Sequence, residues 1–151
     1  MKTKIPAPYY TLINTSIGPD PAVVIVNSAL RTFDHLDYLQ WDLSIVITCE
    51  SLGANGMPNS EEARILNELE DEISESLKLE SNAVFLARVT CRDKREIRYR
   101  VHDPEIANRA LKTLTSSAKP QRQWKYLMKH DPEWRLAKPE LNLLEQDSRY
   151  N

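Results

Sequence analysis

The segment from Trp41 to Leu77 constrains the fold more than any other part of the chain. Apolar residues occupy the odd positions from Trp41 to Cys49, which predicts a strand with one buried face. After a loop with Asn-Gly and a proline, Asn59 is placed to cap a helix and Glu62 to complete a capping box. Apolar residues then recur every three or four positions, so an amphipathic helix is predicted to pack on this strand. They are Leu66, Leu69, Ile73 and Leu77.

Alternating or continuous apolar runs predict further strands on both sides of this segment. These strands are expected at residues 9–14, 22–27, 83–91, 95–101 and 123–129. Asp103 followed by Pro104 predicts the start of a second helix, because Asp caps well and Pro suits the first turn. The inner stripe of this helix is predicted to be Ile106, Ala110, Leu111 and Leu114.

The order of elements from Trp41 to Lys129 predicts an α+β fold, a ferredoxin-like sandwich. Its βαββαβ order would give an antiparallel sheet with two helices on one face, and the N-terminal strands would form an extension. A chain of 151 residues is long enough for one domain with a real core. We expect residues 1–21 to be an N-terminal arm and edge strand, 22–134 a single α+β domain and 135–151 a polar C-terminal tail.

The composition argues against several classes of protein. A net charge of −2 gives no global field of the kind that marks nucleic-acid or membrane-surface proteins. Three glycines argue against a phosphate-cradling loop. Residues 1–8 have no long apolar run, so no signal peptide is predicted, and no segment is predicted to cross a bilayer. With Cys49 and Cys91 expected as buried free thiols, these features predict a cytoplasmic protein.

No residue pattern predicts a metal site, a cofactor or a nucleophile. The three histidines are scattered, and no pair has the spacing of metal ligands. A reactive thiol needs an open, electropositive setting, whereas both cysteines lie in apolar strands. We therefore expect no metal, no cofactor and no catalytic residue.

The helix predicted at residues 60–80 is strongly acidic, with eight Asp and Glu residues. Such a run is most often a solvated face. Paired carboxylates can also perform acid–base catalysis, and an acidic face can dock a basic partner. The candidates for partner contact lie off the apolar stripe and are Glu68, Asp71, Glu72 and Glu75.

Basic residues cluster on the hairpin predicted at residues 83–101. Strict alternation directs Tyr99 inward, so Arg98 and Arg100 are expected on an open face of the sheet. A basic open sheet can bind RNA, but bases then stack on outward aromatic residues, and here the aromatic residues point inward. Nucleic-acid binding is therefore a minority hypothesis. The basic candidates for partner contact are Arg92, Arg95, Arg98 and Arg100.

Several short motifs give the chain a resemblance to a known family. The most specific are Asn55-Gly56-Met57-Pro58 and Asp131-Pro132-Glu133-Trp134, and the others are Asn27-Ser28-Ala29-Leu30, Trp41, Glu62, Leu69-Glu70, Val89-Thr90, Arg95-Glu96 and Tyr99. From about Ala22 to Trp134 the chain resembles the bacterial domain-of-unknown-function family numbered 695. That family usually has a glycine in the hairpin turn, where this chain has Arg92-Asp93-Lys94.

The resemblance implies a ferredoxin-like domain akin to bacterial regulators that inhibit ribonuclease E, and it implies no catalytic residues. Members of such families also occur as immunity proteins beside secreted toxins. The expected function is therefore a non-enzymatic protein-binding inhibitor, an immunity protein whose partner is a bacterial toxin or nuclease. One alternative is a small enzyme that uses Glu62, Glu70 or the Arg98 and Arg100 face on an anionic ligand. The other is a regulator of RNA metabolism of the ribonuclease-inhibitor type.

Overall fold

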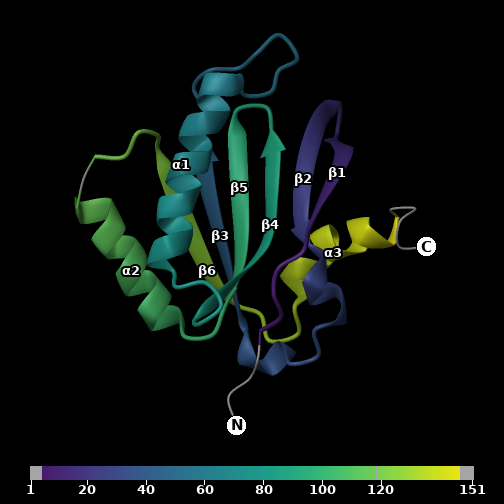
Figure 1. Ribbon diagram of the computed structural model, residues 1–151, viewed down its shortest axis with the longest axis vertical. Helices are drawn as coiled ribbons and strands as arrows, with labels where there is room; N and C mark the ends of the chain where they lie inside the picture. The colour runs from purple at the N-terminus through teal and green to yellow at the C-terminus, as the bar shows by residue number, and fades with distance from the viewer. Residues whose placement is uncertain (1–4, 118, 147–151) are drawn as a thin grey trace.

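The chain folds as a mixed α+β structure around a six-stranded antiparallel sheet (Figure 1). The computed structural model describes residues 5–117 and 119–146. The strands are β1 (Tyr10–Ile17), β2 (Asp20–Asn27), β3 (Trp41–Thr48), β4 (Ala83–Cys91), β5 (Lys94–Val101) and β6 (Trp124–His130), in the sheet order β1-β2-β4-β5-β3-β6. The α-helices are α1 (Ser60–Ser76), α2 (Pro104–Ser117) and α3 (Lys138–Glu145), and the 3-10 helices are η1 (Ser28–Thr32), η2 (Leu36–Tyr38) and η3 (Arg135–Ala137).

The first face of the sheet carries the larger core, which lies under α1 and α2 (Figure 1). Leu43, Ile45 and Ile47 alternate along β3 and are fully buried, as the sequence predicts. The predicted stripe of α1 is confirmed, because none of its residues is more than 5% exposed. That stripe is Leu66, Leu69, Ile73 and Leu77.

The start of α1 is capped as predicted, but the capping box does not form. The side chain of Asn59 accepts a hydrogen bond from the backbone N–H of Glu62 at 2.9 Å. The carboxylate of Glu62 does not return the bond to Asn59. It accepts from the backbone N–H of Glu50 at 2.8 Å and pairs with Arg122 at 2.6 Å. Glu62 therefore ties α1 to the segment before β6, and the expectation for its side chain is wrong.

The second face of the sheet is covered by segments from both ends of the chain. Trp134 packs there with Leu39 and with Leu86 of β4. On α3, Leu144 is fully buried and packs against Val24 and Val26 of β2. Within the C-terminal tail predicted at residues 135–151, residues 138–145 form the helix α3, and its apolar residues lie on one side and pack on the sheet.

The α+β class is confirmed, but the chain is not a simple two-helix ferredoxin-like sandwich. The β1–β2 hairpin extends the sheet, since β2 pairs with β4 from Ala22 opposite Cys91 to Val26 opposite Ala87. A third helix, α3, lies against the second face. The sequence pattern does not reveal this layer, because its contacts join residues far apart in the chain.

Two local predictions are also corrected. The first helix ends at Ser76 instead of residue 80, and Lys78 then adopts a φ of 55° that a helix cannot contain. In α2, Ile106 is 39% exposed and Ala107 takes its place in the core. Trp41 is half-buried and packs against the first core, and Trp134 is 3% exposed in the second.

Candidate binding site: an arginine pocket beside α1

A β-bulge in β4 turns Arg88 onto the first face of the sheet. The pairing of β4 with β5 shifts between Phe85 and Ala87, and both Leu86 and Ala87 are buried on the second face. Arg88 consequently lies on the same face as Phe85. Without the extra residue, strict alternation would place Arg88 on the second face.

The tight β4–β5 turn places Arg95 opposite Thr90. Cys91 pairs with Lys94 across this two-residue turn, and Arg92 adopts a φ of 54° to close it. Such a conformation usually favours glycine, which explains the glycine that the family resemblance leads one to expect here. The register brings Thr90 and Arg95 together, two residues along β4 from Arg88.

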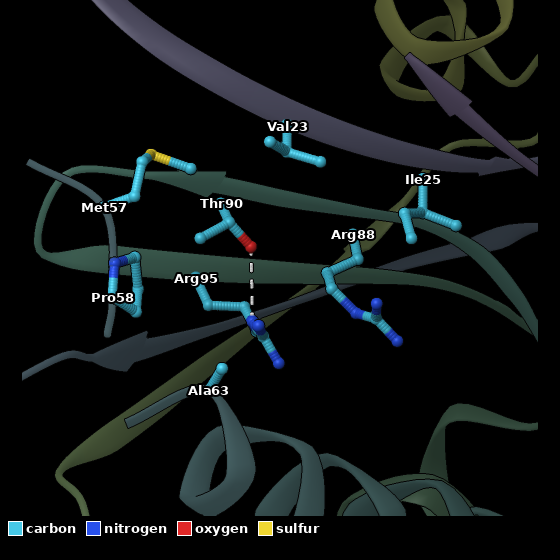
Figure 2. Close-up of a pocket in the computed structure, with 8 residues that line it drawn as sticks. All are labelled: Val23, Ile25, Met57, Pro58, Ala63, Arg88, Thr90 and Arg95. Carbon is cyan, nitrogen blue, oxygen red and sulfur yellow. Dashed lines mark hydrogen bonds between the residues drawn. The ribbon is translucent and has the colours of Figure 1, made fainter. Parts of the chain in front are cut away.

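These three residues line a pocket of about 190 Å³ between the sheet and α1 (Figure 2). Figure 2 shows the side chains of Arg88 and Arg95 extending from the strands toward the side where Ala63 of α1 lies. The rest of the lining is apolar and comes from β2, the loop before α1, and α1. It consists of Val23, Ile25, Met57, Pro58 and Ala63. We call this site the arginine pocket.

The two arginines of the pocket have unequal partners. Arg88 donates from Nε and Nη2 to the two carboxylate oxygens of Glu70, at 2.7 and 2.6 Å. Arg95 donates from Nε to the Thr90 hydroxyl at 3.2 Å and from Nη1 to Oδ1 of Asn67 at 2.7 Å. Its ion pair with Glu70 is longer, at 3.8 Å. One carboxylate therefore serves two guanidinium groups.

The unequal pairing moves the pKa values of the two arginines in opposite directions. Burial, followed by the positive charge of Arg88, lowers the pKa of Arg95, and Glu70 offsets this only in part. Burial also acts to lower the pKa of Arg88, but the hydrogen bonds and charge of Glu70 outweigh it, so that pKa is raised. Arginine donates hydrogen bonds and keeps its proton. The pocket is therefore equipped to bind an anion and not to transfer a proton.

The acidic residues predicted on α1 are exposed, but they are not equivalent. Glu68 pairs with Arg64 at 2.5 Å. Asp71, Glu72 and Glu75 are exposed and make no ion pair with any residue that the structure describes. They lie in the second half of α1. The helix dipole disfavours negative charge in the last turn, which contains Glu75 and no basic residue.

The prediction that Arg100 lines an open face is wrong, because η3 and the adjoining segments cover it. Arg100 is fully buried and pairs with Asp131 at 2.9 Å. It also donates to the backbone oxygen of Leu39 at 3.1 Å, and its guanidinium carbon lies 4.5 Å from the ring centre of Trp134. Arg100 thus holds the second layer on the sheet and is not available to a partner.

Arg98 and Arg92 complete the set of predicted basic residues. Arg98 is 8% exposed and pairs with Asp42 at 2.5 Å and Glu140 at 3.1 Å, so its predicted place on an open face is also wrong. Arg92 is exposed, with a long ion pair of 3.5 Å to Asp20. The partner-binding role of these residues and of the acidic residues on α1 stays a prediction.

A family model matches residues 10–137, which is most of the chain. Its description is "Family of unknown function (DUF695)". The chain belongs to the DUF695 family. This match confirms the resemblance carried by the sequence motifs. No curated protein and no solved structure matches the chain significantly.

Two polar residues that carry the resemblance serve as structural anchors in this DUF695 chain. The side chain of the fully buried Asn27 accepts from the backbone N–H of Tyr9 and Ala29 and donates to the backbone oxygen of Phe85. The carboxylate of Asp131 accepts from the first two backbone N–H groups of η3. The motifs at these two positions therefore specify the fold more than a chemistry.

The described residues of this DUF695 chain give no support to a metal site or to a cysteine nucleophile. None of their His, Cys, Asp and Glu side chains gather in a group of three that could hold a metal ion. Cys49 is a buried free thiol as predicted, whereas Cys91 is only half-buried. Burial, followed by the charge of Glu62, raises the pKa of Cys49 to about 11, which disfavours a thiolate. Among the described helices, none has the length and apolar character needed to cross a bilayer.

Proposed function

We propose that the chain is a non-enzymatic protein-binding module whose partner is a basic protein. The observation that carries this proposal is the exposed row formed by Asp71, Glu72 and Glu75 on α1, which makes no ion pair within 4 Å with any described residue. Like charges in adjacent turns repel each other, and the helix dipole adds to the cost. A positively charged surface would relieve both effects and would speed association.

The size of the arginine pocket also favours binding over catalysis. Sites for small molecules typically enclose about 300–1,000 Å³. The arginine pocket encloses about 190 Å³, which suits one functional group of a ligand or one side chain of a partner. A pocket of this size supports a contact within a larger interface better than a complete substrate site.

The alternative of a small enzyme has one specific observation in its favour, the pocket lined by Arg88 and Arg95. The two carboxylates proposed for such an enzyme, however, already form ion pairs with arginines. Glu62 pairs with Arg122 at 2.6 Å, and Glu70 makes two hydrogen bonds with Arg88. A general acid or base must be able to exchange a proton with a substrate, so we rank this function second.

A bacterial toxin or nuclease that grips a polyanion would present the basic surface that the proposal requires, and we propose this class of partner in a cytoplasmic setting. The other alternative, a regulator of RNA metabolism of the ribonuclease-inhibitor type, has no separate observation in its favour, and direct binding of RNA on the sheet has weaker support. Arg98 and Arg100, which would have contacted the phosphates, are buried in ion pairs.

Association kinetics test the proposed function. A partner is captured from the source organism, identified by mass spectrometry and purified. The variant Asp71→Lys, Glu72→Lys and Glu75→Lys should then associate more slowly, by about tenfold or more at low salt, because steering contributes at least that much. The wild-type rate should fall as the salt concentration rises.

The control applies the same change of charge away from α1. Asp34, Glu133 and Glu145 are exposed, and their reversal to Lys should leave the association rate close to that of the wild type. Equal slowing in both variants would indicate only a global charge effect. A wild-type rate in the α1 variant would show that this helix face is solvated and makes no contact.

A further inference from the structure

Arg95 uses only part of its hydrogen-bonding capacity. A guanidinium group has five N–H donors. Within the described residues, Arg95 makes two hydrogen bonds, to Thr90 and Asn67, whereas Arg100 on the same strand makes four. The Arg95 side chain is 7% exposed, so its remaining donors reach solvent chiefly through the pocket that it lines.

Arg95 is the less well compensated of the two cations at the pocket. Arg88 makes two hydrogen bonds with Glu70 and also lies in the field of the negative charge of Asp71, whereas Arg95 pairs with Glu70 only at 3.8 Å. A sequestered cation is costly unless an anion accompanies it. A monoanion would balance this charge. A phosphate dianion would exceed it and would be repelled by Glu70, which lies 3.8 Å from Nη1 of Arg95.

The rest of the pocket selects for an apolar group attached to that anion. The side of the pocket that faces the arginines is apolar (Figure 2). It is lined by Val23 and Ile25 of β2 and by Met57 of the loop before α1. A carboxylate fits the planar fork of an arginine, and a short hydrocarbon attached to it would bury apolar surface on these side chains. The small volume of the pocket limits that hydrocarbon to a few carbon atoms.

We propose that the arginine pocket is a binding site for the carboxylate of a small apolar monoanion. The carboxylate accepts hydrogen bonds from the free donors of Arg95, and its alkyl group lies against β2 and Met57. Two sources share this chemistry, a free short-chain carboxylic acid and the C-terminal carboxylate of a peptide that ends in an apolar residue. The inference concerns the isolated chain and does not depend on the basic partner proposed above.

Titration of the full chain with butyrate, followed by amide NMR, tests this site. Butyrate should shift the resonances of pocket residues in a saturable manner. Its neutral isostere butyramide should not bind, and inorganic phosphate should bind more weakly than butyrate. Tighter binding of an acetylated dipeptide that ends in Leu, lost when its C-terminus is amidated, would identify a peptide terminus as the source.

Three variants locate the binding. Arg95→Gln should weaken butyrate binding about tenfold, the effect expected for losing a charge-assisted hydrogen bond. Arg92→Gln removes the same charge from the same hairpin, but outside the pocket, and should bind like the wild type. Ala63→Leu keeps every charge and fills the pocket, so it should abolish butyrate binding. This variant tests the site even if Arg95→Gln folds poorly.

Some outcomes would overturn the proposal. Absence of saturable butyrate shifts, or equal affinity in wild type and Ala63→Leu, would show that the pocket is not a carboxylate site. Tighter binding of phosphate than of butyrate would assign a different anion to it. None of these results would bear on the acidic face of α1, because that proposal is tested by association with a protein.

Discussion

The three arginines on β5 show that the acceptors around a side chain decide its role. Buried guanidinium groups persist where oxygen atoms replace their lost water. Arg100 meets this condition fully, with Asp131 and backbone oxygens as acceptors. Arg98 meets it less well, since its Nε has no hydrogen-bond partner. Arg95 also has unused donors, but it lines a pocket through which a ligand can supply the acceptors.

Gly56 is a residue at which substitution should act through the backbone alone. Its φ is 80°, and an added Cβ would meet no atom within 4 Å. An Asn-Gly pair is typical of a turn that needs a positive φ, and Gly56 has one. Gly56→Val should lower the free energy of unfolding by about 1–3 kcal/mol, because a β-branched residue is strained in this conformation. Thermal unfolding followed by circular dichroism should show a loss of about 2–4 °C for each kcal/mol.

Gly53 in the same loop provides the control for this prediction. It has no positive φ, and a Cβ there would lie 3.4 Å from the side chain of Asn55, so Gly53→Ala should unfold near the wild-type temperature. A Gly56→Val variant with wild-type stability that no longer bound its partner would show that the loop is primarily a contact surface.

At the scale of elements, the first layer was predictable because its chemistry is periodic. Alternation in β3 and the three- and four-residue spacing in α1 each predict one buried face, and the structure contains both. The bounds predicted for β4, Ala83 to Cys91, are those observed. Hydrophobic burial depends on which residues are apolar, and that information is local.

The second layer and the pocket were not predictable, because their interactions are not local. The alternation of Arg98 and Arg100 predicts a polar face, but it does not say whether water or buried carboxylates meet that face. The partners that bury them, Asp42, Asp131 and Glu140, come from distant parts of the chain. The bulge that turns Arg88 toward α1 has no glycine or proline to mark it. The pairing of Arg95 with Thr90 follows from the two-residue turn between the strands, so it could have been predicted from the sequence.

The docking of α3 should depend on pH through Glu140, which lies at 7% exposure on the second face. Burial raises the pKa of Glu140 above the ordinary 4.5, and the charge of Arg98 offsets this only in part. A carboxyl with a raised folded-state pKa favours the folded state when protonated. Its contribution is complete below the unfolded-state pKa and is lost as pH rises through the folded-state pKa.

Glu140→Gln should therefore gain stability relative to the wild type as pH rises from below 4.5 to neutral. The measurement is urea unfolding of both proteins across this range. Asn142→Ala, at an exposed position of the same helix, removes no titratable group and should keep a constant difference from the wild type. A constant difference for Glu140→Gln as well would show that Arg98 holds Glu140 ionised throughout the range.

At the scale of the whole molecule, the sheet separates two layers of different chemistry. The first is an apolar core under α1 and α2, and the second combines smaller apolar clusters with buried ion pairs. Figure 1 shows α3 beside the segment that follows β2, so both ends of the chain share the second layer. Arg100 joins its parts, because it bonds the backbone of Leu39 after η2 and the carboxylate of Asp131 after β6.

Replacing Arg100 with Met should therefore weaken the whole second layer. The substitution leaves Asp131 and the Leu39 carbonyl buried without this donor, and breaking a buried pair in this way costs about 3–5 kcal/mol. That is a large part of the roughly 5–15 kcal/mol that stabilises an ordinary domain. Trp134 should report the change, since its ring would lose the guanidinium that covers it and its fluorescence should shift to the red.

Urea unfolding with Trp134 as the sole tryptophan measures both effects, and Arg109→Met on the exposed side of α2 is the control for the loss of one arginine. A red shift in Arg100→Met before the main unfolding transition would show that the second layer opens separately from the first. A single transition at lower urea would show that the two layers unfold together. If Arg100→Met matches Arg109→Met in stability and fluorescence, Arg100 does not join the layers, and Leu144 and Trp134 hold the second layer by apolar packing alone.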